Sequence, residues 1–561
     1  MPALTDIVER GYFPKELPPC FSTRMYAAAL TKAGATPPPQ FNPHGSMADS
    51  KPVTFALARP GTLRRRLAIP HPTAFYRISR LLADHWATIA AHCATSTLSL
   101  SIPVDDPVGR AVKVKEGFAA RSVRRAVDRA GSRYLLRADL AEFYPTLYTH
   151  SIPWALHTKP TAKANRTRMR EAPSGLLGND LDYHYMRCNS NQTKGIAIGP
   201  DPSFVIAESV LAACDVLLVT RLRGVRGFRI YDDFELCFNS LEQAEHGLAV
   251  LQGVLAEYEL ALNPRKTKIV ALPDHLGYDF VSALAQFNFG TEPASQAEVL
   301  IAFFGWLFTY CKSHPDEHVV SYGVGRLKKE AIAPSNWDML TGLLLQAANA
   351  DSSAWQNVAE ILEGAFGKGL PIAKPLIARS VDAAILRHAP CGHSSELAWG
   401  LWLMLRLHLE VSAEATKLLG VLDDPVVALL TLDAEAAGLL QGTLDKTRWQ
   451  ARMSTQDLKS DQWLLAYEAF VQGWLTSPTG ADHLTADAEF DWLRNQGVRF
   501  YQRVSAAVVA APKPTLPVTA APKAGVVKAP SKPAVPAPSV SAPAKEPEPS
   551  TEATDDQWFY F

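Results

Sequence analysis

Two adjacent carboxylates, Asp232 and Asp233, lie between two short runs of apolar, β-favouring residues, 228–231 and 234–238. This pattern predicts a β-hairpin with the carboxylates at its turn. Adjacent carboxylates repel each other and destabilise the fold unless a cation lies beside them. An Asp-Asp pair is also typical of a solvated turn, so a catalytic interpretation needs a third carboxylate from elsewhere in the chain.

Asp139 is a candidate for that third carboxylate. The apolar run 134–138 predicts a strand that ends at Asp139. Phe143 and Tyr144 follow four and five residues later. The end of this strand and the turn of the hairpin must lie side by side if the three carboxylates are to act together.

The order of these residues resembles the palm of reverse transcriptases. The chain reads Asp-x-x-x-Phe-Tyr from Asp139, and Arg-x-x-Asp-Asp-Phe from Arg229. The resemblance implies that Asp139, Asp232 and Asp233 are catalytic and hold two Mg²⁺ ions, with Mn²⁺ as an alternative. It also implies that the substrates are dNTPs.

The aromatic pair after Asp139 belongs to the same resemblance. It implies that Phe143 and Tyr144 are nucleotide-binding residues and that Tyr144 excludes ribonucleotides by steric contact. The hairpin departs from the family pattern, because Ile230 stands where Tyr is usual. Primer contacts and fidelity are therefore expected to differ.

Basic residues are concentrated before the predicted strand. Residues 51–80 contain seven Lys and Arg and no Asp or Glu, as a surface that contacts phosphates would need. Residues 11–19 and 59–72 resemble the fingers of bacterial defence-associated reverse transcriptases of the abortive-infection type. We expect Arg65 and Arg66 to contact template phosphate or the incoming triphosphate; plain surface charge is the alternative.

Two further segments resemble motifs of that family. Gly195 begins a glycine turn before the apolar helix predicted at 204–218, and in the family this turn helps to place template and nucleotide. Ala197 stands where Pro is usual. The stretch 260–269 resembles the next palm motif, in which a Lys lies near the triphosphate. Lys266 is the candidate, and Arg265 and Lys268 are alternatives.

Other possible ligands have simpler interpretations. His150 and His157 have no carboxylate or Cys at catalytic spacing and are interpreted as structural. The segment 391–393, Cys-Gly-His, is interpreted as a loop. Residues 158–190 are basic and then polar, and predict a loop with a short helix.

The composition excludes several classes of protein. The 561 residues carry 56 Lys and Arg and 56 Asp and Glu, so the whole chain has no basic signature. Its seven cysteines form no C-x-x-C pair, which fits a reducing compartment without a disulfide framework. The N-terminal residues lack the apolar stretch of a signal peptide, and no apolar run reaches about 18 residues. We expect a cytoplasmic protein that does not contact membranes.

The chain divides into four expected regions. Residues 1–50 are predicted to be an extended N-terminal segment, and 51–285 the α+β fingers and palm of a right-hand polymerase. Residues 290–505 have helical apolar spacing and predict an all-α, HEAT-like domain. Residues 511–561 are rich in Pro, Ala and Lys and predict a disordered tail with an aromatic end. Tyr560 is interpreted there as part of a docking peptide or, alternatively, as a priming hydroxyl.

These patterns lead to a functional hypothesis. The chain is expected to be an RNA-directed or template-independent DNA polymerase in antiphage defence, with protein priming as one option. Expected partners are RNA or single-stranded DNA, further copies of the chain, and a non-coding RNA or a protein bound through the tail. The alternatives are a retroelement or retron-type reverse transcriptase and a non-catalytic, RNA-binding oligomeric scaffold.

Overall fold

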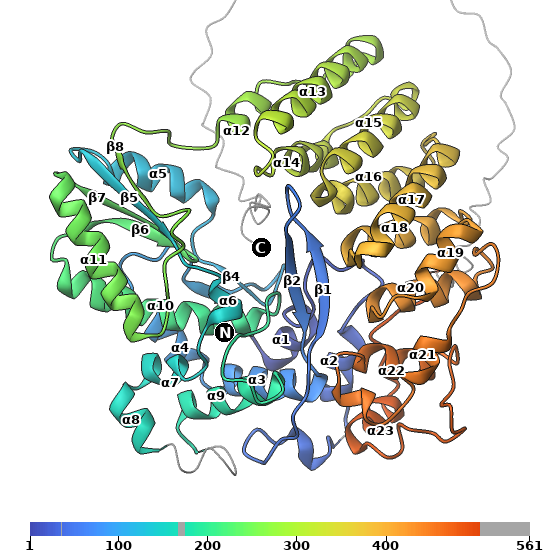
Figure 1. The fold of residues 1–561 in the computed structure, drawn as a ribbon, viewed down its shortest axis with the longest axis horizontal. Helices are drawn as coiled ribbons and strands as arrows, with labels where there is room; N and C mark the ends of the chain where they lie inside the picture. Colours follow the sequence, from blue (N-terminus) through green and yellow to red (C-terminus); the bar gives the residue numbers. More distant parts are fainter. Residues whose placement is uncertain (35, 166–173, 505–561) are drawn as a thin grey trace, which may run out of the picture.

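The computed structural model describes residues 1–34, 36–165 and 174–504. This part of the chain is mostly helical, with small antiparallel sheets. Figure 1 shows a lobe built around the largest sheet, a second lobe of stacked helices, and a two-stranded hairpin between them. Tyr560 and the rest of the predicted tail lie outside the described residues.

The first part of the chain alternates helices and strands. In order these are α1 (Leu4–Arg10), α2 (Arg24–Thr31), β1 (Val53–Ala58), β2 (Arg64–Ile69), α3 (Pro72–Asp84), α4 (Trp86–Cys93), β3 (Pro103–Asp105), β4 (Val112–Val114), α5 (Phe118–Asp128), β5 (Tyr134–Asp139), α6 (Phe143–Thr146), α7 (Ser151–Leu156), α8 (Lys159–Ala164), α9 (Leu177–Cys188), α10 (Asp201–Arg221), β6 (Arg226–Ile230), β7 (Asp233–Phe238), α11 (Leu241–Glu257), β8 (Lys268–Ala271) and α12 (Asp279–Leu284).

The largest sheet has the strand order β6-β7-β5-β8, and all of its strand pairs are antiparallel. Apolar side chains of β5 and β7, such as Leu136 and Leu236, share a buried core with side chains of α10 and α11. Gly227 allows β6 and β7 to approach closely, because a Cβ at this position would lie 2.1 Å from the Glu235 carbonyl oxygen. The shared core holds the sheet against α10 and α11.

The hairpin of β1 and β2 is held against the helical lobe by its backbone. The amides of Ala56 and Ala58 donate hydrogen bonds to the hydroxyls of Ser394 and Ser395, at 3.1 and 2.9 Å. Edge strands expose unpaired backbone groups, and here serine side chains at the start of α18 (Ser394–Leu407) satisfy them. One end of the hairpin is therefore positioned by residues more than three hundred positions away in sequence.

The helical lobe is an array in which each helix packs against near neighbours in the sequence (Figure 1). Nearly every residue of α18 is buried, since α16, α17, α20 and β1 surround it. Classification as HEAT repeats stays a prediction. The helices other than α18 are α13 (Pro293–Ser313), α14 (Val319–Arg326), α15 (Trp337–Ala350), α16 (Trp355–Gly367), α17 (Lys374–His388), α19 (Ala413–Gly420), α20 (Pro425–Ala436), α21 (Thr447–Ala451), α22 (Trp463–Val471) and α23 (Ala488–Asn495).

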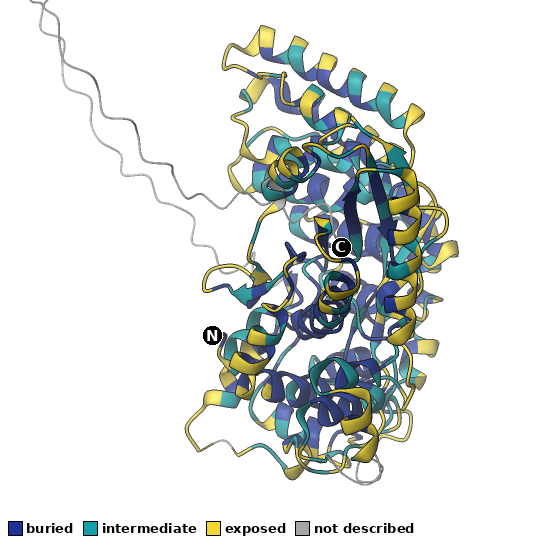
Figure 2. Cartoon of the chain, turned by 90° about the vertical axis from the view of Figure 1, so that its left-hand side faces the viewer, coloured by how far each residue is buried: buried dark blue, intermediate teal, exposed yellow. Residues whose placement is uncertain are grey.

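The N-terminal segment is not simply extended, because it contains α1 and α2 and belongs to the core of the helical lobe. The Ser22 amide donates to the Phe500 carbonyl at 3.0 Å, and the Gln502 amide donates to the Cys20 carbonyl at 2.8 Å. Residues of both segments form one buried cluster. Figure 2 shows the buried residues on the inner faces of the elements and the exposed ones outside. The described part of 158–190, where a loop with a short helix was predicted, contains two helices, α8 and the buried, 12-residue α9.

One helix, α10, is long and apolar enough to cross a membrane by length and composition. The sequence expectation that no apolar run reaches this length was therefore too strict. Most of the helix is buried inside the protein against the sheet and its neighbouring helices. Its apolar character is explained by this packing.

Candidate active site

Strand register brings the predicted carboxylates to one edge of the largest sheet. Asp139, the last residue of β5, pairs directly with Asp233, the first residue of β7. Ile230 also pairs with Asp233, so the turn between β6 and β7 consists of Tyr231 and Asp232. Tyr231 has a φ of +50°, which a tight turn of this kind requires. The three aspartates therefore lie together, as the sequence predicts for a shared site.

Burial and mutual repulsion act on the carboxylates of Asp232 and Asp233. Burial raises the pKa of Asp232, and the nearby Asp139 raises it further. Burial, followed by repulsion from Asp232, raises the pKa of Asp233 to about 7, although 30% of its side-chain surface is accessible. A group of carboxylates in this state is stabilised by a neighbouring cation.

Basic side chains already lie beside the aspartates. Lys266 Nζ is 2.8 Å from Asp139 Oδ2, and Asn263 Nδ2 donates to Asp139 Oδ1 at 3.2 Å. Arg121 Nη2 lies 3.8 Å from Asp233 Oδ2. The structure thus places Lys266 against a carboxylate of the predicted site. Arg121, from α5, was not singled out by the sequence, where it was one of several basic residues.

Arg121 belongs to a cluster of arginines around a buried carboxylate, Glu235 of β7. Burial alone raises the pKa of Glu235, but Arg125, Arg121 and Arg129 outweigh burial and lower it to about 2. Arg125 Nε and Arg129 Nη2 lie 3.0 and 2.9 Å from its carboxylate oxygens. Arg121 and Arg125 of this cluster line a cavity of about 280 Å³ together with Asp139, Asp233 and Lys266.

A buried ion-pair network stabilises the hairpin that carries Asp232. Arg229 of β6 is fully buried and donates to Glu208 Oε2 at 2.9 Å and to Asp215 Oδ2 at 2.7 Å. It also donates to the Tyr231 carbonyl at 2.7 Å. The guanidinium therefore connects α10 to the turn and fixes the turn in place.

The two aromatic residues after Asp139 have different environments. Tyr144 is half-buried, and burial, followed by the charge of Asp232, raises the pKa of its hydroxyl. Phe143 is only 4% exposed and packs in the core, where its ring meets that of Tyr144 at a centroid distance of 5.4 Å. Tyr144 thus lies near the carboxylates, whereas Phe143 packs in the core. The nucleotide contact of Phe143 stays a prediction.

Gly195 is needed where the glycine turn meets the segment after Asp139. Its φ is +91°, and a Cβ here would lie 2.9 Å from the Pro145 carbonyl oxygen. The amides of Gly195 and Ile196 donate to the carbonyls of Leu147 and Tyr144, at 2.9 and 3.0 Å. The turn is therefore hydrogen-bonded to the backbone of Tyr144 and positions it.

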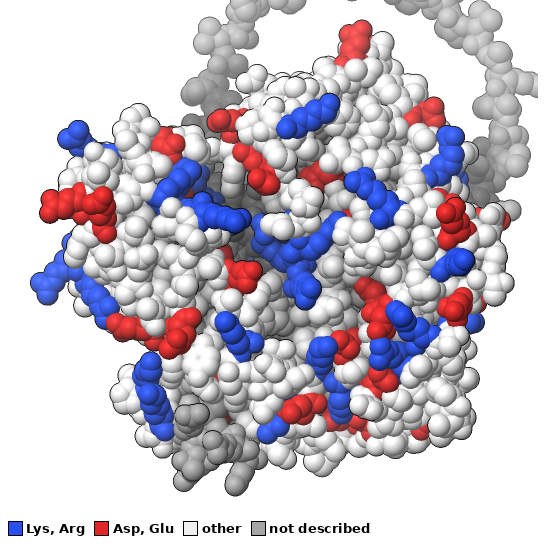
Figure 3. Space-filling model, viewed as in Figure 1, with Lys and Arg blue, Asp and Glu red and all other residues white. Residues whose placement is uncertain are grey.

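The arginines of β2 face different partners. Burial lowers the pKa of Arg65, and its electrostatic neighbours include Asp232 and Tyr144. Arg66 is exposed. Arg64 turns to the helical lobe, where Nη1 and Nη2 donate to Glu396 Oε1 and His393 Nδ1, at 2.6 and 2.8 Å. Figure 3 shows a hollow between the two lobes with Lys and Arg side chains on both sides of it.

The structure changes the interpretation of two histidines, His150 and His393. His150 pairs through Nδ1 with Asp182, thirty-two residues away, so it does have a carboxylate partner. His393 is not only a loop residue: among the described residues, His388, His393 and Glu396 form the group whose potential ligand atoms lie within 4.8 Å of one another. The three aspartates do not meet that distance criterion. Beside His393 and Glu396, the guanidinium of Arg64 already donates hydrogen bonds to both residues.

Comparisons with known proteins give no family. No family model matches the chain, and no curated protein matches it. Among solved structures, the chain is similar to a telomerase from Candida albicans, solved with a TWJ fragment of telomeric RNA, at 10% identity and a TM-score of 0.28. The match covers 57% of this chain and 63% of that one.

Proposed function

We infer that this protein is a metal-dependent nucleotidyltransferase of the reverse-transcriptase type, an RNA-directed or template-independent DNA polymerase. The observation that carries the proposal is the register of β5 and β7, which pairs Asp139 with Asp233 beside the turn at Asp232. Three carboxylates, with basic residues around them, are the side chains that phosphoryl transfer needs.

The donor set fits divalent magnesium or manganese. Mg²⁺ prefers oxygen ligands and binds through carboxylates and substrate phosphates. Asp139, Asp232 and Asp233 would hold it. Burial, followed by repulsion from neighbouring carboxylates, raises the pKa values of Asp232 and Asp233, and a divalent ion relieves that repulsion. When bound, the metal lowers the pKa of an attacking hydroxyl and neutralises charge on the phosphates.

The chain's own residues account for substrate placement. Arg65 and Lys266 approach the carboxylates from β2 and from the loop before β8, where cations neutralise a triphosphate. Arg121 and Arg125 extend the positive wall of the adjoining cavity. Tyr144 keeps its hydroxyl protonated and lies near Asp232, where it would pack against the sugar of a dNTP.

A second candidate is a non-catalytic scaffold that binds RNA and forms oligomers. The ion pairs of Lys266 with Asp139 and of Arg121 with Asp233 favour it, because a basic side chain already lies beside each of these carboxylates without a metal. Under the polymerase proposal, the side chains of Lys266 and Arg121 would leave these carboxylates and bind substrate phosphates instead. Metal-dependent incorporation of dNTPs distinguishes the two functions.

The test uses the purified full chain with the nucleic acid that it carries. Each labelled dNTP is supplied with Mg²⁺, and products are separated with and without protease. A product that shifts on protease digestion indicates protein priming, and a product lost after RNase pretreatment indicates an RNA template. No product with Mg²⁺ or Mn²⁺ contradicts the polymerase proposal.

The biological role that we propose is antiphage defence, on the basis of the resemblance in the fingers and palm motifs. Expression in a susceptible bacterium should lower phage plating, and Asp232→Asn should abolish that effect. Equal protection by the variant would contradict a role for synthesis in defence.

A further inference from the structure

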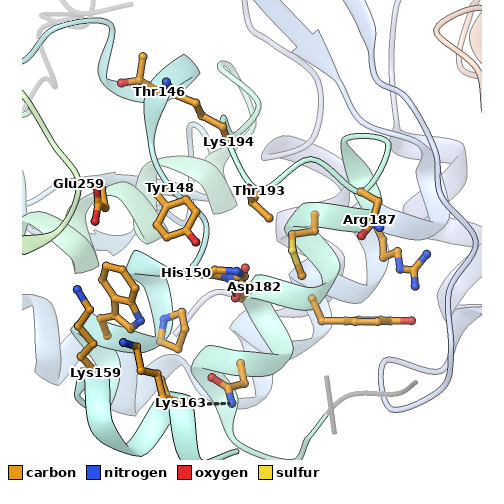
Figure 4. Close-up of a pocket in the computed structure, with 17 residues that line it drawn as sticks. Thr146, Tyr148, His150, Lys159, Lys163, Asp182, Arg187, Thr193, Lys194 and Glu259 are labelled. Atoms are coloured by element: carbon orange, nitrogen blue, oxygen red, sulfur yellow. Dashed lines mark hydrogen bonds and ion pairs between the residues drawn. The ribbon is translucent and has the colours of Figure 1, made fainter. Parts of the chain in front are cut away.

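A second cavity is lined by residues of the segment that follows Asp139, among them Tyr148 and His150. It has a volume of about 960 Å³ and is enclosed by α7, α8, α9 and the segment before Gly195. Figure 4 shows side chains from these elements pointing into one space. Pockets for small ligands measure about 300–1,000 Å³, so this one is at the upper end and can take more than a single nucleotide.

One wall of the cavity is aromatic. The rings of Tyr148 and Trp154 meet edge to face at a centroid distance of 5.6 Å, and both are half-buried. Lys159 Nζ lies 3.9 Å from the centroid of the Trp154 ring. Bases of single-stranded nucleic acid stack on such surfaces, since every base has a π-face.

The rim of the cavity is basic. Lys159, Lys163 and Lys194 are exposed there and form no ion pair with any described residue. Arg187 also lines the cavity, but Asp49 holds it at 2.7 Å. Glu259 is an exposed carboxylate on the same rim. The rim therefore presents more positive than negative charge, as the phosphates of a strand require.

The floor of the cavity contains buried polar groups whose bonding is incomplete. Asp182 is buried and bonds through Oδ2 to His150 Nδ1, which orients the imidazole at the cavity wall. Asp182 Oδ1 and Asn179 Oδ1 are also buried, and neither has a hydrogen-bond partner among the described residues. Buried acceptors of this kind are destabilising.

The cavity and the candidate active site share one piece of backbone. Tyr148 and Lys194 form an antiparallel bridge, and the Thr149 amide donates to the Thr193 carbonyl at 2.9 Å. The same pairing continues to Ile196 and Tyr144. A nucleic-acid strand that occupies the cavity is therefore adjacent to the turn that positions Tyr144.

We propose that this cavity binds a segment of single-stranded nucleic acid, with bases against Tyr148 and Trp154 and phosphates at Lys159, Lys163 and Lys194. Its role as a guide for a template strand rests on the proposed function. Strand binding itself needs no synthesis and can be measured separately.

The test measures binding to the full chain after bound nucleic acid has been removed in high salt. The probe is a fluorescein-labelled single strand of about twelve nucleotides, within the usual site sizes for such proteins. The double variant Lys159→Ala/Lys163→Ala should bind about tenfold more weakly. The slope of log K against log salt should fall by about 1.4, since each phosphate contact on a single strand contributes about 0.7.

A matched control removes two exposed lysines of the helical lobe, Lys368→Ala/Lys417→Ala, which should leave affinity and slope unchanged. Unchanged values in the cavity variant, or displacement of the strand by a mononucleotide of equal affinity, would overturn the proposal. Cross-linking of wild-type protein to a 4-thiouridine strand, read by mass spectrometry, should modify Tyr148 or Trp154; cross-links confined to other regions would also overturn it.

Failure of this inference can be told apart from failure of the proposed function. Asp232→Asn should abolish dNTP incorporation and leave strand binding unchanged. If that variant behaves as expected while the lysine variant binds normally, the polymerase proposal stands and the cavity proposal does not.

Discussion

Lys266 Nζ lies 2.8 Å from Asp139 Oδ2, so an ammonium group occupies the side of the carboxylate that faces the cavity beside Asp233. Under the proposed function, the side chain of this lysine leaves the carboxylate and pairs with a substrate phosphate. Lys266→Ala should lower kcat/KM for dNTP incorporation by about tenfold. A charge-assisted hydrogen bond contributes about 1.5–3 kcal/mol, and the lower value applies because 58% of the side chain is exposed. The exposed neighbour Lys268, substituted in the same way, should retain activity; the reverse result would assign the role to Lys268.

Asp232→Asn should abolish incorporation while leaving the fold intact. The substitution keeps the shape of the turn but removes a charge that would hold a metal, and metals supply several kcal/mol of transition-state stabilisation. The expected loss is at least about a thousandfold, measured with labelled dNTPs, and circular dichroism should match the wild type. Asp84→Asn, a surface substitution on α3, is the control and should leave the rate unchanged. Substantial residual activity in the Asp232 variant would refute the assignment.

Tyr144→Ala should relax selection against ribonucleotides. The ring lies near Asp232, at the place where the resemblance puts the sugar of the nucleotide. Its removal should raise the ratio of rNTP to dNTP incorporation by at least about tenfold, a change of about 1.4 kcal/mol. Tyr144→Phe keeps the ring and should keep the selection. If both variants discriminate like the wild type, Tyr144 is not the gate.

Arg229→Met should destabilise the lobe that contains the largest sheet. The substitution leaves Glu208 and Asp215 buried without their cation, and removal of one partner from a buried ion pair costs about 3–5 kcal/mol. The unfolding midpoint in denaturant should fall clearly. Arg223→Met, at an exposed position nearby, should have little effect. Similar midpoints for both variants would show that the network adds little to stability.

Glu468→Gln should remove a pH dependence from the helical lobe. Burial raises the pKa of Glu468 to about 7, from an ordinary value near 4.5, even though the Phe500 amide donates to it. Because the folded-state pKa is the higher one, stability is fully present below pH ~4.5 and is lost as pH rises to ~7, by about 3 kcal/mol.

The measurement for Glu468 is the melting temperature between pH 5 and pH 8. The Gln variant should melt close to the wild type at pH 5 and higher than the wild type at pH 8. Glu298→Gln, on an exposed face of α13, should follow the wild type throughout. A Glu468 variant that loses stability equally at both pH values would show that the side chain is ionised in the folded protein.

Local patterns were sufficient to place several elements of the candidate site. The apolar runs on either side of Asp232 and Asp233 predicted a hairpin, and the run before Asp139 predicted a strand that ends there; β6, β7 and β5 have those positions. The helices after residue 290 could also be predicted, because apolar spacing of helical period is visible in any short window.

Other features depended on contacts that no local pattern encodes. The pairing of Asp139 with Asp233, the arginines around Glu235 and the bond between His150 and Asp182 join residues far apart in the sequence. The burial of Phe143 in the core likewise depends on how α6 packs.

The sequence by itself determined which residue types end the strands and where the helices lie, because backbone preference and apolar period act over a few residues. The tertiary structure alone decided that residues 20–22 join 500–502, and that a cavity opens between α7, α8 and α9. Those features depend on burial and hydrogen bonding between distant segments, which only the folded chain brings into contact.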